Sequence, residues 1–370
     1  MDFQKEFPLN DDILYMNHAA VSPWPKRTQQ AVQNFATQNA TVGSKHYLQW
    51  LETEQSLRNK LASLVDAQSA DEIALLKSTS EGLSTIAYGL DWQSGDEIII
   101  SNEEFPSNRI VWQSLANQGV KVIEVDLKGD HVVNIERAIS TKTRLIAISS
   151  IQYASGRVIN LEALGKLCQQ HNVLFCIDAI QSLGVMPFSA QSCNADFVVA
   201  DGHKWMMGPE GLALFYCRKE IQHTLKLNQF GWHMVADAGN FDNHDWTIAD
   251  SAKRFECGSP NMLGAHALNA SLSLILEVGI DTIFSLTQQL HTYLRTQLTS
   301  AGFEILSPKE DFCGITTFKT NTENHKDLYQ KLMANNVICA PRGGGIRFSP
   351  SFYQDKETVD KAIHMVKKLL

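Results

Sequence analysis

Short apolar runs alternate with amphipathic stretches over residues 70 to 220. The runs are rich in β-branched residues and have the length of buried strands. They cover residues 72–76, 97–101, 120–125, 145–149, 173–177, 197–200 and 212–217. The stretches between them, such as 161–171, repeat apolar residues with the 3.6-residue period of a helix. This alternation predicts an α/β domain in which helices flank a seven-stranded, mostly parallel sheet.

The chain on either side of this region predicts further helices and a second set of strands. A helical stretch at 29–65 is broken near 41–44, and 219–257 has the polar composition of irregular structure. After residue 261 the pattern predicts, in order, helices at 263–278 and 282–300, strands at 303–306, 315–318, 337–340 and 346–349, and a helix from Lys356. We therefore expect a large domain at 20–257 and a smaller α+β domain formed by 1–19 and 258–370.

Composition and charge narrow the class of partner. The 370 residues are 44% hydrophobic and 19% charged, as in an ordinary globular protein. The net charge of -8 comes without a long basic block, so we expect neither a nucleic acid nor a membrane as partner. Acidic residues precede any apolar run at the start, and no stretch approaches the roughly 20 apolar residues of a membrane span. A small-molecule substrate and a cytoplasmic location are the resulting expectations.

The cysteines favour free thiols. There are seven of them, no Cys-x-x-Cys pair occurs, and several, such as Cys176, lie inside apolar runs. This pattern argues against a disulfide framework and against zinc, and we expect no metal site.

Polar residues with chemical potential follow directly after several predicted strands. In open α/β sheets, ligands bind beyond the carboxyl ends of the strands. Thr79 and Ser80 follow the first run, Asp178 and Gln181 follow the fifth, and Lys204 follows the sixth.

Together these residues match the needs of pyridoxal-5′-phosphate (PLP) chemistry. PLP enzymes use a lysine amine to form a Schiff base, a carboxylate to keep the pyridine nitrogen protonated, and a phosphate cradle. Lys204 offers the amine, Asp178 the carboxylate, and Gln181 a donor to the ring oxygen. Thr79 and Ser80 begin a predicted helix, whose N-terminus can bind phosphate.

Each of these residues also has an ordinary interpretation. A lysine after a strand is usually solvated, and an aspartate there commonly caps a helix or forms a turn. The sequence Ser-Thr-Ser-Glu at 78–81 matches a capping box. Their joint occurrence at the strand ends of one sheet, in this order, favours a cofactor site.

Three segments carry a resemblance to a known family. They read Asp-Ala-Ile-Gln-Ser at 178–182, Ala-Asp-Gly-His-Lys-Trp-Met-Met-Gly-Pro-Glu-Gly at 200–211, and Arg-Phe-Glu-Cys-Gly-Ser-Pro-Asn at 254–261. In order and spacing the chain resembles the class V aminotransferase family of fold-type I PLP enzymes, which includes cysteine desulfurases, isopenicillin-N-epimerase-like proteins and kynureninases. The resemblance implies PLP as cofactor, an amino-acid substrate, and a homodimer with shared active sites.

The resemblance also assigns cofactor contacts. His203 is expected to contact the PLP phosphate, and Asp201 belongs to the same cofactor-binding segment. Ser259, where many relatives have Thr, is expected to reach the phosphate of the neighbouring subunit. Phe105 falls where the family has a ring stacked on the pyridine, usually His in desulfurases and an aromatic residue in kynureninase-like members. Without the family, Ser259 followed by proline simply predicts a turn, and Phe105 a core residue.

Substrate contacts follow from the same resemblance. Arg347, after three glycines, is similar to the family's arginine for the substrate carboxylate, and its planar fork suits a bidentate pair. His18 lies in a segment similar to the one that folds over the site, so we expect it to contact substrate. Tyr153 stands where one group of desulfurases has an Asn for the ring oxygen, which leaves open the roles of Tyr153 and Gln152.

The resemblance leaves the reaction open. Our first hypothesis is an aminotransferase, because desulfurases need a thiolate on a mobile loop, and the one nearby cysteine, Cys339, lies in an apolar run. The short passage from Pro341 to Arg347 leaves no room for a longer cysteine-bearing loop. A desulfurase or carbon–sulfur lyase ranks second, and an amino-acid epimerase and a PLP-binding regulatory module are further alternatives. A nicotinamide enzyme is disfavoured because no Gly-x-Gly-x-x-Gly follows the first strand.

Overall fold

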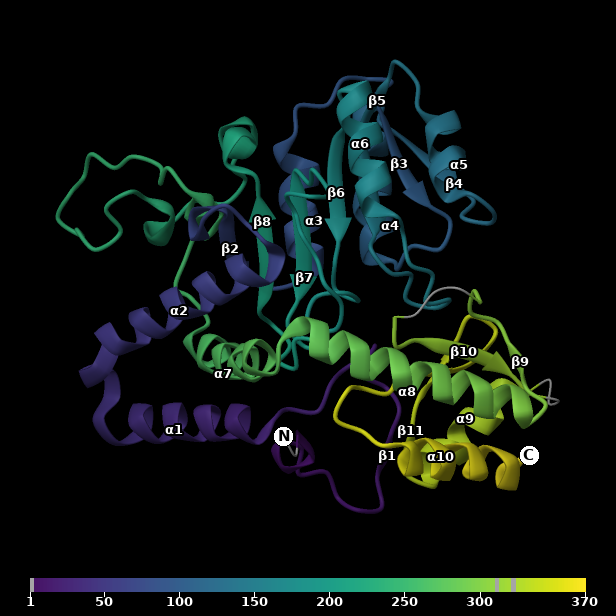
Figure 1. Cartoon of the computed structure of the whole chain (residues 1–370). Helices are drawn as coiled ribbons and strands as arrows, with labels where there is room; N and C mark the ends of the chain where they lie inside the picture. The colour runs from purple at the N-terminus through teal and green to yellow at the C-terminus, as the bar shows by residue number, and fades with distance from the viewer. Residues whose placement is uncertain (1–2, 310–312, 321–323) are drawn as a thin grey trace.

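A seven-stranded sheet forms the centre of the larger part of the molecule (Figure 1). In the computed structural model, which describes residues 3–309, 313–320 and 324–370, the strand order is β2-β8-β7-β6-β5-β3-β4. Neighbouring strands are parallel except for the two pairs that include β8. The strands are β2 (Ile73–Leu76), β3 (Glu97–Ser101), β4 (Lys121–Val125), β5 (Thr143–Ser149), β6 (Leu174–Asp178), β7 (Phe197–Asp201) and β8 (Ala213–Cys217). The predicted α/β fold with a mostly parallel sheet is confirmed.

Both faces of this sheet are buried. Phe175 and Ile177 of β6 belong to one apolar core, and Cys176 between them belongs to another. Because successive side chains of a strand point to opposite faces, each face has its own core, which explains the unbroken apolar runs in the sequence. The helices that alternate with the strands are α3 (Thr79–Gly89), α4 (Ser107–Gln113), α5 (His131–Ala138) and α6 (Leu161–His171).

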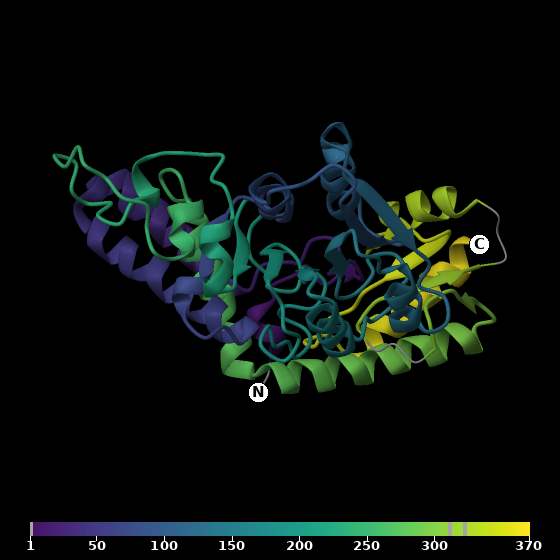
Figure 2. The same ribbon diagram turned by 90° about the horizontal axis from the view of Figure 1, so that it is seen from above.

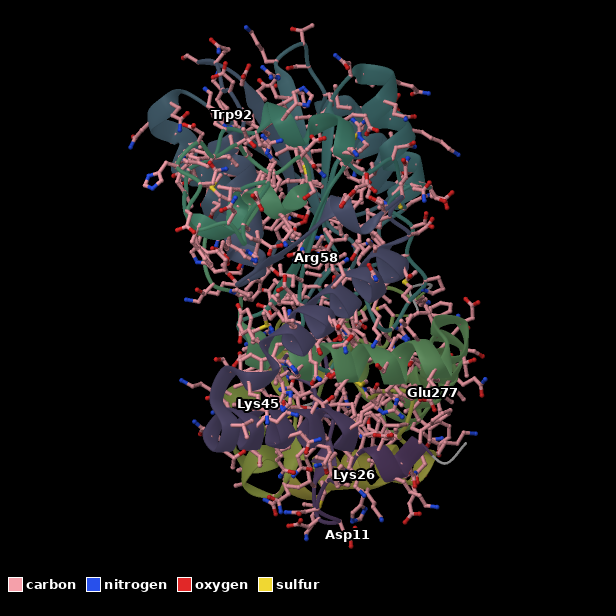
Figure 3. All side chains as sticks on the ribbon, turned by 90° about the vertical axis from the view of Figure 1, so that its left-hand side faces the viewer. Asp11, Lys26, Lys45, Arg58, Trp92 and Glu277 are labelled. Carbon is pink, nitrogen blue, oxygen red and sulfur yellow. The ribbon has the colours of Figure 1, made fainter. Side chains whose placement is uncertain are left out.

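Two long helices precede the sheet. They are α1 (Lys26–Val42) and α2 (Tyr47–Val65), joined by the short 3-10 helix η2 (Gly43–His46), which holds Lys45 at the bend in Figure 3. The bend agrees with the predicted break, since Gly43 has a positive φ of 59° that favours glycine. Both helices pack on α7 (Met262–Val278). The predicted domain boundary at residue 258 stays a prediction, and α7 lies against helices of the predicted large domain.

A buried ion network fixes α2 to the sheet. Arg58, labelled in Figure 3, donates hydrogen bonds at 2.6 Å to Glu54 and Glu256 and at 2.7 Å to the carbonyl of Ile73. Glu54, Glu256 and His233 lie close enough for a metal site, with ligand atoms within 4.8 Å of one another. Arg58 forms an ion pair with each of these two carboxylates and offsets part of their charge.

The C-terminal part has its own core around a four-stranded antiparallel sheet in the order β12-β13-β10-β9. Its strands are β9 (Glu304–Ile305), β10 (Thr316–Lys319), β12 (Ala340–Arg342) and β13 (Gly345–Phe348). Its helices are α8 (Ile280–Ser300), α9 (His325–Ala334) and α10 (Lys356–Leu369), and α8 forms one long edge of the molecule in Figure 2. Strand β10 and helix α10 match the predicted pattern closely.

Taken singly, the described helices differ from membrane-spanning segments in length or composition. Within the described ranges, no single helix is long and apolar enough to cross a membrane. Taken together, α7 and α8 have the length and apolar composition of a membrane span, but the two helices bend by 81° at their junction.

Short 3-10 helices occupy several connections. They are η1 (Phe3–Glu6), η3 (Ala70–Glu72), η4 (Ser114–Gln118), η5 (Lys219–Thr224), η6 (Trp232–Met234) and η7 (Ala252–Phe255). The last three belong to the segment predicted to be irregular, part of which extends away from the sheet as a long loop in Figure 1.

An N-terminal strap connects the two parts of the molecule. Strand β1 (Leu14–Tyr15) pairs in parallel with β11 (Val337–Ile338), and Asn17 forms a bridge with Ser349. Farther along, the backbone N–H of Ser22 donates to the carbonyl of His203 at 2.9 Å. The strap therefore runs from the C-terminal sheet to the turn that carries Lys204.

Candidate active site

A cavity of about 340 Å³ opens where β2, β6 and β7 end. Strands β2 and β7 are both antiparallel to β8, so all three present their carboxyl ends at the same edge of the sheet. Most of the predicted site residues line this cavity: Thr79, Ser80, Phe105, Tyr153, Asp178, Gln181, Asp201, His203, Lys204 and Arg347. His18 and Ser259 do not.

Lys204 and Asp178 are two of the buried charged residues that line the cavity, 9% and 2% exposed. Burial lowers the pKa of the Lys204 amine and raises the pKa of the Asp178 carboxyl, and the charge of each group partly offsets the shift of the other. Oδ1 of Asp178 accepts a hydrogen bond from the N–H of Ile180 at 3.0 Å. Lys204 therefore offers a nucleophilic amine, and Asp178 offers a carboxyl group that a cationic ligand atom would stabilise in its charged form.

Helix α3 points its N-terminus toward the cavity. Its N-cap, Ser78, accepts a hydrogen bond from the N–H of Glu81. Thr79 Oγ1 accepts from the N–H of Asp201 at 3.0 Å, which ties the helix start to the end of β7. Ser80 Oγ donates to Ser107 Oγ at 2.9 Å. This arrangement offers hydroxyl groups and a positive helix end to an anion.

Two polar atoms beside α3 lack hydrogen-bond partners. Nδ1 of His203 lies 2.9 Å from Oδ1 of Asp201. The two atoms nevertheless miss hydrogen-bond geometry, and both are buried without a partner. Since buried polar groups are rarely left unsatisfied, this corner is suited to receive a polar ligand.

Gln181 is held firmly at the cavity wall. Its Oε1 accepts a hydrogen bond from the indole N–H of Trp205 at 2.9 Å, and its Nε2 donates to the carbonyl of Ala19 at 2.9 Å. An amide nitrogen carries two hydrogens, so one donor remains for a ligand. The predicted contact of Gln181 with a ring oxygen agrees with this geometry and stays a prediction.

Two aromatic rings border the cavity. The centroid of the Phe105 ring is 5.6 Å from Lys204 Nζ, and the side chain is 40% exposed in this structure. The Tyr153 ring packs edge-on against Phe105, with centroids 5.1 Å apart. The neighbouring Gln152 is fully buried and donates to Glu104 at 2.9 Å, so Tyr153, rather than Gln152, lines the cavity.

Arg347 is a buried cation anchored by neutral groups. It is 2% exposed and donates to the carbonyl of Tyr153 at 2.6 Å and to Oδ1 of Asn17 at 3.3 Å. Burial, reinforced by the charge of Arg342, lowers its pKa to about 10, so it remains protonated at neutral pH. In the described part of the chain it has no carboxylate within ion-pair distance, and its Nε lacks a partner. A substrate carboxylate could form the ion pair that Arg347 lacks.

His18 lies outside the cavity, behind Trp205. Its ring is fully buried, and its nitrogens contact the carbonyl of Ser349 at 2.9 Å and the hydroxyl of Tyr353 at 2.7 Å. The ring stacks on Trp205 with centroids 6.0 Å apart. Protein groups occupy both nitrogens and no solvent reaches them, so this structure offers no support for the predicted contact of His18 with substrate, which stays a prediction. His18 supports the strap behind Trp205.

Ser259 lies apart from Lys204. It lines a different hollow together with Cys257 and Lys77. Within a single chain it therefore does not join the cavity, and its predicted contact with a neighbouring subunit stays a prediction.

Sequence reasoning missed two contributors to the site. Arg342 lines the cavity, although only its position within the glycine-rich segment pointed to it. Glu104 is buried behind the cavity and accepts hydrogen bonds from Ser149, Asn108 and Gln152. A lone glutamate in a loop sequence carries no signal of such a buried network.

These residues fit PLP. The cofactor combines an aldehyde, a cationic pyridine nitrogen and a phosphate dianion, and the cavity pairs a buried amine with a buried carboxyl group. The N-terminus of α3 and the imidazole of His203, which lines the cavity, suit the phosphate. No described feature of the cavity opposes this assignment.

Comparison with known proteins agrees with the site. Residues 14–361 match the family model described as aminotransferase class-V. A probable cysteine desulfurase of Pyrococcus abyssi is 31% identical over 394 residues, covering 100% of this chain and 97% of the relative. The fold is similar to the apo structure of a cysteine desulfurase from Thermococcus onnurineus NA1, with a TM-score of 0.89, 24% identity, and coverage of 100% of this chain and 97% of the other. It is equally similar to the cystine C–S lyase C-DES in complex with cysteine persulfide, with a TM-score of 0.89, 22% identity and 98% coverage of both chains. The chain belongs to the class V aminotransferase family and is a PLP-dependent enzyme.

Proposed function

We propose that this PLP-dependent enzyme is an aminotransferase whose amino-acid substrate binds Arg347 through its α-carboxylate. One observation carries the proposal: the residues described as lining the cavity include a buried amine and guanidinium groups but no thiol. Transamination needs a base to move a proton and a group to orient the substrate. It needs no sulfur acceptor.

The proposed roles of the chain's own residues follow from their surroundings. Bound PLP supplies an electron sink for the negative charge that develops at the α-carbon. Asp178 holds the pyridine nitrogen protonated, and α3 with His203 binds the phosphate. Lys204 Nζ takes the α-proton, and its lowered pKa leaves more of the amine unprotonated near neutral pH. Phe105, whose ring centroid lies 5.6 Å from Lys204 Nζ, would pack against the cofactor ring and has no titratable group.

Arg347 orients the substrate in this proposal. A guanidinium held by a backbone carbonyl and an amide oxygen keeps a fixed direction, so the bound carboxylate fixes the α-carbon near Lys204. Burial also excludes water from this contact, which strengthens the charge-assisted hydrogen bonds.

A second candidate is a carbon–sulfur lyase or desulfurase acting on cysteine or cystine, favoured by what the relatives are called. The thiols of this chain limit that reading. Cys339 is 1% exposed, and burial raises its pKa to about 12. Cys257, the one thiol of the chain with partial exposure, contacts Gln229 in the hollow that contains Ser259. Sulfur released in the cavity would therefore leave to solvent or to a small acceptor, which is lyase chemistry.

We further propose a homodimer in which Ser259 reaches the partner's phosphate site. Its support is the matched family and the position of Ser259 in a hollow distinct from that of Lys204. Light scattering of the holoenzyme tests the dimer. All seven cysteines are free thiols, which supports a reducing, cytoplasmic location.

The deciding experiment separates the reactions by their products. The holoenzyme is supplied with ¹⁵N-labelled amino acids and unlabelled 2-oxo acids, and mass spectrometry follows transfer of the label. Cysteine and cystine are assayed in parallel for sulfide and pyruvate, and deuterium uptake at the α-carbon without net conversion reports an epimerase. Label transfer that disappears in Lys204→Ala supports the aminotransferase. Sulfide and pyruvate without label transfer would replace it with the lyase.

A further inference from the structure

Two arginines lie side by side on one face of the hairpin formed by β12 and β13. In this antiparallel pair Ala340 is opposite Arg347, and Arg342 is opposite Gly345. Side chains alternate along a strand, so Arg342 and Arg347 share a face as diagonal neighbours. Both line the cavity that contains Lys204.

Neither arginine has an acidic partner among the described residues. Arg347 donates only to neutral oxygens. Arg342 donates to the carbonyl of Pro341, its own neighbour, at 3.0 Å. Glu210 also lines the cavity, but it forms no ion pair with either arginine. The hairpin thus presents two guanidinium groups, neither in an ion pair among the described residues, to a cavity that is also lined by Asp178 and Asp201.

The two charges oppose each other. Burial lowers the pKa of Arg347 and of Lys204, and the positive charge of Arg342 lowers both further because a like charge disfavours the protonated form. Such an arrangement costs free energy in the empty site. A ligand with two negative groups relieves it, whereas a ligand with a single carboxylate leaves one guanidinium uncompensated.

We propose that Arg342 binds a second acidic group of the substrate, so that the enzyme selects dicarboxylic amino acids and the corresponding 2-oxo acids. The α-carboxylate pairs with Arg347 and the side-chain carboxylate with Arg342. This inference rests on the proposed aminotransferase function and names its substrate class. The cofactor phosphate is assigned elsewhere, at the N-terminus of α3, and does not consume either guanidinium.

The turn of the hairpin gives Arg342 a defined position. Gly343 and Gly344 have positive φ values of 57° and 79°, which only glycine adopts easily. A Cβ on Gly343 would lie 3.4 Å from the carbonyl oxygen of Ala154, so the turn is seated against the segment that also holds Arg347. Arg342 remains exposed at its outer side, which leaves it accessible to an entering ligand.

Calorimetric titration of the holoenzyme with unreactive acids tests this proposal without turnover. Glutarate carries two carboxylates and butyrate carries one. We expect glutarate to bind at least 10-fold more tightly than butyrate. Arg342→Gln should lower the affinity for glutarate by about 10- to 100-fold, because one charge-assisted contact is lost. The affinity for butyrate should change little. Arg342→Lys should recover part of the affinity for glutarate.

Matched variants exclude trivial explanations. Arg144→Gln removes the same charge at an exposed site paired with Asp96, and should leave both affinities unchanged. Arg347→Gln should weaken both acids. Equal affinity of the parent enzyme for the two acids, or equal weakening of both by Arg342→Gln, would overturn the proposal. A glutarate preference that depends on Arg342 in an enzyme without label transfer would instead reject the aminotransferase function alone.

Discussion

Protonation of His18 is expected to destabilise the folded protein in mild acid. The carbonyl of Ser349 can only accept, so Nδ1 of His18 carries the proton and Nε2 accepts from the hydroxyl of Tyr353. The folded chain therefore holds a neutral imidazole. Complete burial lowers its pKa from 6.5 to about 4.

The sign and size of the effect follow from linkage. Between pH 6.5 and pH 4 the unfolded chain binds a proton at His18 that the folded chain does not, so the free energy of unfolding falls as the pH falls. Each pH unit is worth about 1.4 kcal/mol. His18 alone should then remove about 2 kcal/mol of stability between pH 7 and pH 5.

Urea unfolding of His18→Asn measures this contribution. The asparagine amide can keep the hydrogen bond to Ser349 but does not titrate, so the variant should be less stable at pH 7 and lose less stability on acidification. His364→Asn, on the exposed face of α10, is the control, because an exposed imidazole keeps its hydration on folding. Parallel stability curves for wild type and His18→Asn from pH 7 to pH 5 would refute the reasoning.

Four further substitutions probe the site and its support. Lys204→Ala should abolish borohydride-trapped labelling by PLP, whereas Asp178→Ala should retain some labelling and lose turnover; mass spectrometry and steady-state assays check both. Arg347→Lys should raise KM by about 10-fold or more, since a bidentate contact becomes a single one; an unchanged KM would contradict its assigned role. Arg58→Met should lower the free energy of unfolding by about 3–5 kcal/mol, because two carboxylates stay buried without their partner; chemical denaturation measures it.

Much of the fold could be predicted because local pattern and tertiary structure agree. Strand β3 and helix α6 have the predicted bounds, since apolar period and flanking turn residues point to the same limits. The candidate cofactor residues could be predicted from the sequence for a similar reason. Asp178 and Lys204 follow strands, and the topology of a parallel sheet gathers strand ends at one edge.

The remaining features depend on long-range contacts. The surroundings of His18 come from Ser349 and Tyr353, more than 300 positions away, and no local pattern reports them. The position of Arg342 and Arg347 on the same face depends on the register of the β12–β13 hairpin. Its turn contains two glycines with positive φ. The network around Arg58 joins α2 to the end of the irregular segment. Sequence spacing predicts contacts between residues close together in the chain far better than contacts between distant segments.

The N-terminal strap has a consequence for biosynthesis. Leu14 and Tyr15 pair with Val337 and Ile338, so β1 finds its partner only after the much later segment that contains β11 has left the ribosome. Until then its backbone donors and acceptors remain unpaired, and the wall of the cavity near His203 lacks its contact with Ser22. The nascent chain can build the seven-stranded sheet earlier, since domains commonly fold as they emerge. We therefore expect the cofactor site to mature after the seven-stranded sheet has folded.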